Sequence, residues 1–386
     1  MRILIDTTQI PLARTGVGIY AENLIKEIAV ILRPEDTLFL LIQDDDQSLR
    51  MWISKHAQIR PLHVPSRFFR NRIALALYEQ CILPWVLLQN HIDIVHSLHY
   101  TFPLFCPCSR IVTIHDMTFF LCPQMHTRSK RVVMPFFIKM ALRYAEGVLF
   151  VSESTRKDAE RMFGPESNLR AVTPLGVEEA CFAVVPQQSK KDTLSRLKVK
   201  VPYILYLGTL EPRKNVLRLI QAFELIGNKY PQHALVIAGG LGWNYKPTLD
   251  AIEQSPLKHR ILRLGYIASE DKLPLIAGCD LMAYPSLYEG FGLPVLEGMA
   301  AGVPVVTSNV SSLPEVAGPG AALIDPFSLE ELAKAIETVV ENRKYRDSLI
   351  VAGKQQAKAF RWEKTAELTY HAYKTMYTVR SLTLSQ

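Results

Sequence analysis

Short apolar segments alternate with helical patterns along almost the whole chain. In the first half, the segments expected to form strands are 2–5, 38–42, 93–96, 110–114, 148–151 and 170–173. In the second half, they are 203–207, 234–238, 261–264, 280–284, 304–307 and 321–324. Strands that alternate with helices are typical of a parallel sheet with helical crossovers. The pattern therefore predicts an α/β fold.

The spacing of apolar residues also places individual helices. Leu24, Ile25 and Ile28 begin a pattern, continued by Ile31 and Leu32, that predicts an amphipathic helix over 18–32. Ser328 and Glu331 form a capping box ahead of another helix. A last helix is expected over 362–377. It carries more apolar side chains than a solvated tail needs, so it should pack across a domain, and the first domain is a candidate.

The polar stretch 186–200 interrupts the alternation and is interpreted as a linker or linker helix. The expected domains are an acceptor-side Rossmann-like domain over 1–185, a nucleotide-sugar-binding Rossmann-like domain over 201–358, and a C-terminal crossover helix and tail over 359–386. Ligands in open α/β sheets bind outside the carboxyl ends of the strands. We therefore expect two Rossmann-like domains that face a central cleft, with the active site between them.

Length and composition narrow the class of protein. The chain has 386 residues, of which 48% are hydrophobic and 21% charged, which excludes a disordered tail or a small disulfide scaffold. The six cysteines form no C-x-x-C pair and no leader-like segment precedes the first apolar run, so a reducing, cytoplasmic location is expected. The net charge of +7 is modest for this length and gives no indication of a nucleic-acid partner.

Positive charge gathers in one part of the sequence. The region 67–143 contains nine cations and three anions. It also contains the aromatic residues Phe68, Phe69, Trp85, Phe136 and Phe137. Cations among aromatic side chains suit an anionic membrane surface, and the alternative is a basic solvated face over a core. The most apolar run, 73–89, is interrupted by Glu79 and Pro84 and is too short to span a bilayer.

The segment 280–302 carries the most informative motif. An apolar strand is followed by a loop with Glu289, by flexible glycines, and by a helix whose first turn contains Glu297. The amides of Phe291, Gly292 and Leu293 lie between the two carboxylates. Free amides at a helix N-terminus bind phosphate, and carboxylates accept hydrogen bonds from sugar hydroxyls. The segment therefore predicts a nucleotide-sugar site.

A second segment, YLGTLEPRKN at 206–215, predicts an anion site. A strand ends at Leu207, Gly208 turns the chain, and Arg213 and Lys214 come just before a helix. Two cations beside a helix N-terminus can stabilise a leaving diphosphate without a metal. The alternative is a pair of surface cations, unfavourably placed for the helix dipole.

Other motifs are weaker. GVGIYA at 16–21 matches a dinucleotide fingerprint, which suggests a nicotinamide-dependent oxidoreductase, but Asp6 to Thr15 separate it from the first strand. His115 follows a predicted strand and is either catalytic or a structural histidine. Asp44 and Asp46 form a D-x-D that could bind a metal, although a solvated loop is the preferred interpretation. Cys106 and Cys108 lack a second pair for zinc.

Taken together, these motifs resemble the retaining glycosyltransferases of family four, which have the GT-B fold. The segment 280–302 is similar to their E-x7-E region, and the resemblance covers nearly the whole chain. Its other parts include GVGIYAENL at 16–24, TIHDMTFFLCP at 113–123, VSESTRKD at 151–158, YLGTLEPRKN at 206–215, GGLGW at 239–243, LGYIASEDKL at 264–273, SSLPEVAG at 311–318 and FRWEKTA at 360–366.

The resemblance implies roles for individual residues. Lys214 would contact the donor diphosphate, with Arg213 as second cation, while Glu289 would position the sugar and Glu297 the ribose. His115 would touch the donor sugar, and Gly16 would approach the donor phosphate or the acceptor. Base selection would involve the backbone near Tyr266 and Ile267. No cofactor and no metal are expected.

The donor and acceptor follow from the same resemblance. The lysine loop is similar to that of bacterial enzymes that use GDP-mannose in O-antigen or exopolysaccharide synthesis, and UDP- and dTDP-sugars remain alternatives. A saccharide or polyprenyl-linked oligosaccharide acceptor is expected, which would place the enzyme at the inner face of the cytoplasmic membrane. A non-catalytic sugar-binding module is a further alternative.

Overall fold

The protein is described by a computed structural model that covers residues 1–10, 14, 16–66, 71–165 and 168–384. The chain forms two compact units. The first comprises Met1–Pro123, Arg128–Gly176 and Trp362–Gln386, and the second comprises Val177–Arg361 with Gln124–Thr127. Among the described helices, none is both long and apolar enough to cross a bilayer.

A parallel sheet of seven strands forms the centre of the first unit, in the order β3-β2-β1-β4-β5-β6-β7. The strands are β1 (Arg2–Asp6), β2 (Thr37–Gln43), β3 (Ile59–Val64), β4 (Ile94–Ser97), β5 (Ser109–Ile114), β6 (Gly147–Phe150) and β7 (Leu169–Val172). The strands predicted from the sequence in this half of the chain are all present within one residue at each end. The sequence missed β3, because Pro61 lies inside it and three of its six residues are exposed.

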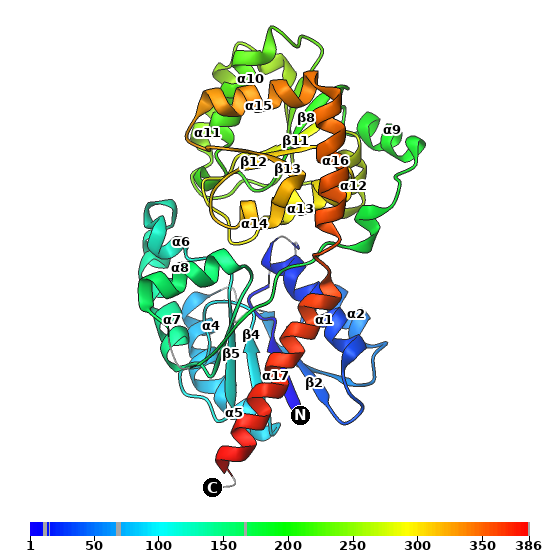
Figure 1. The fold of residues 1–386 in the computed structure, drawn as a ribbon. Helices are drawn as coiled ribbons and strands as arrows, with labels where there is room; N and C mark the ends of the chain where they lie inside the picture. The colour runs from blue at the N-terminus through cyan, green and yellow to red at the C-terminus, as the bar shows by residue number, and fades with distance from the viewer. Residues whose placement is uncertain (11–13, 15, 67–70, 166–167, 385–386) are drawn as a thin grey trace. The chain divides into compact units, whose positions relative to one another are not determined.

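Helices cover both faces of this sheet (Figure 1). One face carries α1 (Val17–Ile31) and α17 (Trp362–Leu384), which pack against each other. The predicted C-terminal helix therefore packs on the first unit. The other face carries α5 (Leu83–Gln89) over Leu4 and Val95, and α7 (Arg128–Tyr144) over β5 and β6. The remaining helices are α2 (Gln47–Ile53), α4 (Arg72–Leu77), the π-helix η1 (Tyr78–Ile82), α6 (Thr118–Leu121), the 3-10 turn η2 (Pro123–Met125) and α8 (Glu153–Phe163).

The second unit contains a parallel sheet of six strands in the order β10-β9-β8-β11-β12-β13. The strands are β8 (Tyr203–Leu207), β9 (Ala234–Ala238), β10 (Ile261–Gly265), β11 (Leu281–Tyr284), β12 (Val305–Ser308) and β13 (Ala321–Ile324), all predicted from the sequence within one residue at each end. Its helices are α9 (Gln187–Arg196), α10 (Val216–Gly227), α11 (Lys246–Gln254), α12 (Ser269–Ala277), α13 (Leu293–Ala300), α14 (Leu313–Ala317), α15 (Leu329–Glu341) and α16 (Arg343–Ala357). Its 3-10 turns are η3 (Glu179–Phe182), η4 (Pro212–Lys214), η5 (Lys258–Arg260) and η6 (Gly318–Gly320).

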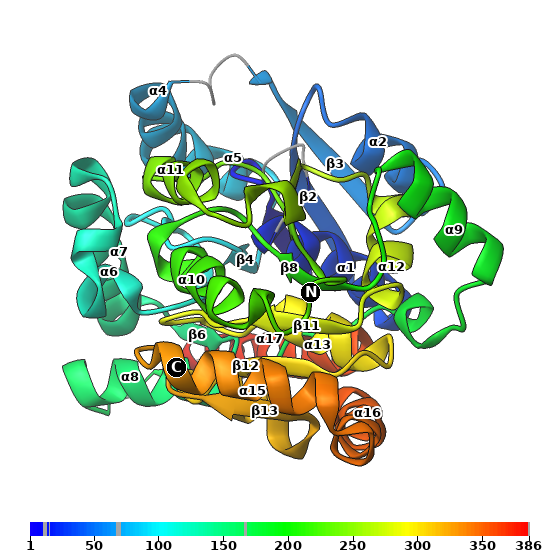
Figure 2. The same cartoon turned by 90° about the horizontal axis from the view of Figure 1, so that it is seen from above.

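The stretch expected to be a linker, 186–200, is part of the second unit. It forms α9, which lies beside α12 (Figure 2). An ion pair joins Arg196 of α9 to the buried Asp271 of α12. The division between the units falls at residues 176–177 and 361–362 instead, apart from the short stretch Gln124–Thr127, which groups with the second unit.

Candidate active site

In the second unit, the site forms where neighbouring strands lead the chain in opposite directions. The strands β8 and β11 pair side by side, and their helical connections run toward opposite edges of the sheet. Such a switch point leaves a crevice at the carboxyl ends of the strands. The loop after β8 carries Arg213 and Lys214, and the loop after β11 carries Glu289.

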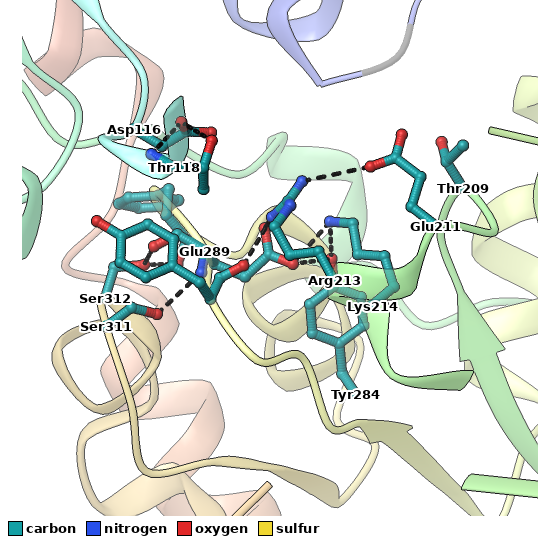
Figure 3. A network of polar contacts seen from close by, with 12 residues as sticks. Asp116, Thr118, Thr209, Glu211, Arg213, Lys214, Tyr284, Glu289, Ser311 and Ser312 are labelled. Carbon is teal, nitrogen blue, oxygen red and sulfur yellow. Dashed lines mark hydrogen bonds and ion pairs between the residues drawn. The ribbon is translucent and has the colours of Figure 1, made fainter. Parts of the chain in front are cut away.

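The carboxylate of Glu289 binds both predicted cations (Figure 3). Arg213 Nη1 donates to Oε2 at 2.8 Å, and Lys214 Nζ donates to Oε1 at 2.7 Å. The hydroxyl of Tyr284, the last residue of β11, donates to Oε1 at 3.0 Å and accepts from Lys214 Nζ at 2.7 Å. The two cations therefore share one carboxylate, and Glu211 Oε2 lies 3.9 Å from Arg213 Nη2 as a second, more distant anion.

Burial and ion pairing set the charge of this group. Glu289 is 6% exposed, and burial alone would raise the pKa of its carboxyl. The Arg213 and Lys214 cations outweigh that effect and lower its pKa to about 2. Burial, together with the charge of Arg213, lowers the pKa of Lys214, and Glu289 opposes the shift. We infer that Glu289 is ionised at neutral pH.

The backbone around Glu289 is held from two other loops. Its amide donates to Ser311 Oγ at 2.9 Å, and Ser312 Oγ donates to the carbonyl oxygens of Glu289 and Phe291 at 3.0 and 2.8 Å. On the opposite side, Asn215 Nδ2 donates to Pro285 O at 3.0 Å. The sequence did not identify these three polar residues, because each acts through backbone atoms of a distant loop.

Phe291, Gly292 and Leu293 lie at the N-terminus of α13, as predicted. Gly292 has φ of 111°, a left-handed conformation that favours glycine, and Leu293 is the first helical residue. The first-turn amides of a helix have no intrahelical acceptors. The backbone amides at the start of α13 can therefore donate hydrogen bonds to an anion.

Glu297 is the fifth residue of α13, so it lies beyond the first turn in which the sequence placed it. It has a partner that the sequence did not reveal. Lys272 of α12 places Nζ 2.5 Å from Glu297 Oε1, and the side chain of Glu297 is 9% exposed. Lys272 lies in the segment LGYIASEDKL that contributes to the family resemblance, but nothing in its spacing pointed to Glu297. The ion pair holds the carboxylate in one place.

The remaining predicted residues of the second unit lie in loops at the same sheet edge. Gly208 follows β8 and its amide donates to Ala238 O at 2.9 Å. Tyr266 and Ile267 lie between β10 and α12, and the side chain of Tyr266 is 57% exposed. No described contact joins these residues to Glu289.

His115 and Gly16 belong to the first unit. His115 follows β5, and its Nε2 lies 2.8 Å from Leu98 O. A carbonyl oxygen can only accept, so Nε2 carries the proton, and burial lowers the pKa of the ring. Gly16 precedes α1 and its carbonyl accepts from the amide of Tyr20, whose ring lies 5.2 Å from that of His115. Tyr20 therefore contacts both Gly16, through its amide, and His115, through its ring.

The weaker motifs have local structural roles. Asp116 accepts from the amide and hydroxyl of Thr118 (Figure 3) and so stabilises a turn. Asp46 caps α2 and pairs with Arg14 at 2.5 Å, while Asp44 accepts from the amide of Ser66. In the described part of the chain, no three histidine, cysteine or acidic side chains gather as metal ligands do.

Comparison with known proteins identifies the family. Residues 15–180 match the model described as Glycosyltransferase Family 4, and residues 188–356 match Glycosyl transferases group 1. The O-antigen chain mannosyltransferase B of Escherichia coli is 31% identical over 97% of this chain and 100% of its own length. The chain belongs to glycosyltransferase family 4.

Solved structures agree on the fold of this family-4 glycosyltransferase. Sucrose-phosphate synthase from Thermosynechococcus elongatus superposes with a TM-score of 0.77 and 18% identity, over 98% of this chain and 99% of its own. Anabaena Alr3699/HepE in complex with UDP-glucose gives 0.75 and 19% identity, over 97% and 100%. The predicted GT-B fold is therefore confirmed. Because the family is that of a glycosyltransferase, the oxidoreductase suggested by GVGIYA is wrong; Gly16 and Gly18 open α1 well beyond the end of β1.

Proposed function

We propose that this glycosyltransferase moves a mannosyl group from GDP-mannose to a saccharide or lipid-linked saccharide during cell-surface polysaccharide synthesis, with retention of anomeric configuration and without a metal. The observation that carries the proposal is the joint anchoring of Arg213 and Lys214 by Glu289. The choice of mannose rests on the relative of similar length, which is named an O-antigen chain mannosyltransferase. UDP- and dTDP-sugars are the alternatives, since Alr3699/HepE was solved with UDP-glucose.

In this proposal, fixed positive charges of the protein stabilise the diphosphate as it leaves. The bond between the anomeric carbon and the phosphate oxygen breaks, and its electron pair stays with the diphosphate. Arg213, Lys214 and the amides near Gly292 stabilise the negative charge that develops there. Glu289 stabilises the positive charge on the sugar ring, while Glu297 binds the ribose and His115 touches the donor sugar. Gly16 would approach the donor phosphate or the acceptor. Gly208 turns the chain toward the loop that carries Arg213 and Lys214. The backbone near Tyr266 and Ile267 would select the base of the nucleotide.

The acceptor hydroxyl attacks the face that the diphosphate leaves. Its oxygen bonds to the anomeric carbon, and its proton passes to the departing phosphate. No side chain needs to act as the base. No cofactor is needed either, because the two cations supply the charge that a metal would bring.

A panel of nucleotide sugars tests the donor. Transfer from GDP-mannose to a labelled acceptor, with kcat/KM at least tenfold above that for UDP-glucose, UDP-galactose or dTDP-rhamnose, is the expected result. Proton NMR of the purified transfer product gives the anomeric configuration of the new glycosidic bond. A preferred UDP- or dTDP-sugar, or an inverted product, would contradict the corresponding part of the proposal.

We also propose that the first unit binds the cytoplasmic face of an anionic membrane. The helix α7 exposes Val132, Val133 and Phe136 beside exposed cations. On the same face of the sheet, α4 exposes Ile73 and α5 exposes Trp85. Mixed apolar and basic surfaces of this kind bind anionic lipid headgroups. Arg67, Phe68, Phe69 and Arg70 of the predicted basic region lie outside the described residues, and Arg110 pairs with Glu146.

Flotation with liposomes tests the membrane proposal. Vesicles that contain phosphatidylglycerol should carry the protein to the top of a gradient, and neutral phosphatidylcholine vesicles should not. Replacement of Arg128, Lys130 and Arg131 by Gln should weaken binding by about 100-fold, since each of the three cations contributes roughly 1 kcal/mol. The matched control replaces Arg343, Lys344 and Lys358 of the second unit, which are equally exposed. Equal loss in both variants would overturn the proposal.

A further inference from the structure

Two cysteines lie side by side in the loop that leads into β5. Cys106 and Cys108 flank Pro107, both are free thiols, and their Sγ atoms are 3.5 Å apart. A disulfide joins Cα atoms about 4.4–6.8 Å apart, and two steps along the chain span at most about 7 Å. The two thiols can therefore form a disulfide without a large movement of the backbone.

The turn that carries the two cysteines is held from both sides. Arg110 Nη1 donates to Leu104 O at 2.8 Å, and Arg380 Nη2 of α17 donates to Pro107 O at 2.5 Å. Proline also fixes its own φ and restricts the residue before it. These contacts hold the two sulfur atoms together before any bond forms, so little conformational entropy is lost when they react.

The two thiols differ in access and in acidity. Cys108 is 3% exposed and packs in the apolar core that contains Leu87 of α5, whereas Cys106 is partly exposed. The hydrogen bond with Cys108 lowers the pKa of the Cys106 thiol against the effect of burial, and the charge of Arg110 adds to this lowering while Glu146 opposes it. The same hydrogen bond, together with burial, raises the pKa of Cys108. We infer that Cys106 is the more acidic thiol and that Cys108 donates its S–H to it.

An accessible thiol of lowered pKa beside a second thiol is the arrangement that favours reaction with peroxides. We propose that Cys106 is a site of reversible oxidation by hydrogen peroxide, and that Cys108 resolves the sulfenic acid of Cys106 as an intramolecular disulfide. The site precedes Ser109, the first residue of β5, whereas His115 follows the last. The two cysteines are therefore separate from the candidate active site, and the proposal does not rest on the proposed function.

The reaction has two steps. The thiolate of Cys106 attacks one oxygen of hydrogen peroxide, so that a sulfur–oxygen bond forms, the oxygen–oxygen bond breaks and hydroxide leaves. The thiol of Cys108 then gives up its proton, and its sulfur attacks Cys106. The disulfide forms, and the sulfenic oxygen leaves as a second hydroxide. Two thiols are oxidised and one peroxide is reduced, and the two hydroxides take up the protons of the thiols to become water.

The resolving thiol decides whether the oxidation can be undone. A dithiol reductant returns a disulfide to two thiols by exchange, whereas a sulfenic acid without a partner is open to further oxidation to sulfinic acid, which thiols do not reduce. Cys108 therefore protects Cys106 from irreversible oxidation.

Peptide mapping of the full chain tests the proposal. The protein is treated with stoichiometric hydrogen peroxide, free thiols are blocked with N-ethylmaleimide, and trypsin releases the peptide 73–110, which contains Cys81, Cys106 and Cys108. Cys81→Ser leaves only the pair in this peptide. The peptide of that variant should lose two hydrogen atoms and take up no maleimide, and dithiothreitol should restore its reaction with two maleimides.

Two further variants, made in the Cys81→Ser background, separate the roles of the two sulfur atoms. Cys108→Ser keeps a hydrogen-bond donor beside Cys106 and removes the resolving sulfur, so peroxide should leave a sulfenic acid on Cys106 that dimedone traps. In Cys106→Ala, buried Cys108 should react with peroxide at least about tenfold more slowly than Cys106 does in Cys108→Ser. In wild type, exposed Cys81 is the internal comparison and should react more slowly than Cys106.

The mapping of Cys81→Ser leaves the pair intact, so it decides even if a change at buried Cys108 unfolds the protein. Maleimide on both Cys106 and Cys108 after peroxide, or sulfinic acid on Cys106 in place of the disulfide, would overturn the proposal. A disulfide between two chains, seen as a dimer on a non-reducing gel, would contradict it, and so would faster oxidation of Cys81 than of Cys106 in wild type. Recovery of both thiols by dithiothreitol, with dimedone on Cys106 in Cys108→Ser, supports it.

Discussion

Lys214 Nζ lies 2.7 Å from Oε1 of Glu289, on the oxygen that Arg213 does not bind. The two cations thus approach one carboxylate from separate oxygens, and neither can move without breaking a charged hydrogen bond. Preorganised charges of this kind stabilise a transition state because they need not reorganise as the reaction proceeds.

Lys214→Ala should lower kcat by about 100-fold, because one preorganised positive charge on the leaving diphosphate is lost. Steady-state kinetics with a nucleotide-sugar donor measure the change, and circular dichroism checks the fold. Lys229→Ala is the matched control, since Lys229 is an exposed lysine of the same unit that pairs with Glu337 and Glu341. Turnover of Lys214→Ala close to that of wild type would remove this residue from the proposed role.

Glu289 should make the stability of the protein sensitive to acid. Its pKa is about 2 in the folded protein and 4.5 as a free side chain. A lowered pKa means that the carboxylate contributes stability above pH 4.5 and that this contribution is lost as the pH falls toward 2. The contribution is on the order of 3 kcal/mol at neutral pH. Denaturant unfolding at pH 7, 5, 4 and 3 should therefore show Glu289→Gln less stable than wild type at pH 7, with the difference in unfolding free energy reduced to about half or less at pH 3.

The control for this measurement is Glu253→Gln, which changes an exposed carboxylate of α11 in the same unit. Its difference from wild type should be small at every pH. A difference between Glu289→Gln and wild type that stays constant from pH 7 to pH 3 would contradict the assignment of an ionised Glu289.

The sequence alone was sufficient to predict twelve of the strands, because buried parallel strands are continuous apolar runs. It failed for β3, an edge strand with Pro61 and polar residues on its exposed side. It interpreted 186–200 as a linker or linker helix, and the segment forms the helix α9 within the second unit. Most side chains of this helix are polar because only one of its faces packs against the protein. Its ion pair could not be predicted, because Arg196 and Asp271 are 75 positions apart in the sequence.

The candidate site was predicted in part. Arg213, Lys214 and Glu289 carried local signals in two loops, and the structure brings them together. Lys272 could not be linked to Glu297 from the sequence, because the pairing depends on how α12 lies against α13.

Removal of divalent metal should leave transfer unchanged. If Arg213 and Lys214 stabilise the leaving diphosphate as proposed, the reaction needs no metal bound to it. We expect the transfer rate in about 10-fold excess EDTA over residual metal to equal that of the untreated enzyme. Subsequent addition of Mg²⁺ or Mn²⁺ should change this rate by less than about twofold. Loss of activity in EDTA, restored by either ion, would refute the metal-independent mechanism.

Lys272 and Glu297 should act as one unit in donor binding. Their ion pair of 2.5 Å is partly shielded from water, since the side chains are 29% and 9% exposed. Lys272→Met keeps the length of the side chain and removes its charge, so Glu297 is left without its cation. If Glu297 binds the ribose, the donor KM should rise by about tenfold in Lys272→Met and in Glu297→Gln, with a smaller change in kcat.

The donor KM of the double variant should be scarcely higher than that of either single variant, because the effects of residues that share one interaction are not additive. Lys258→Met, at an exposed lysine of η5, is the control and should leave the donor KM unchanged. Additive effects of the two substitutions would mean that Lys272 and Glu297 act on the donor independently, and an unchanged KM in both would exclude Glu297 as the ribose ligand.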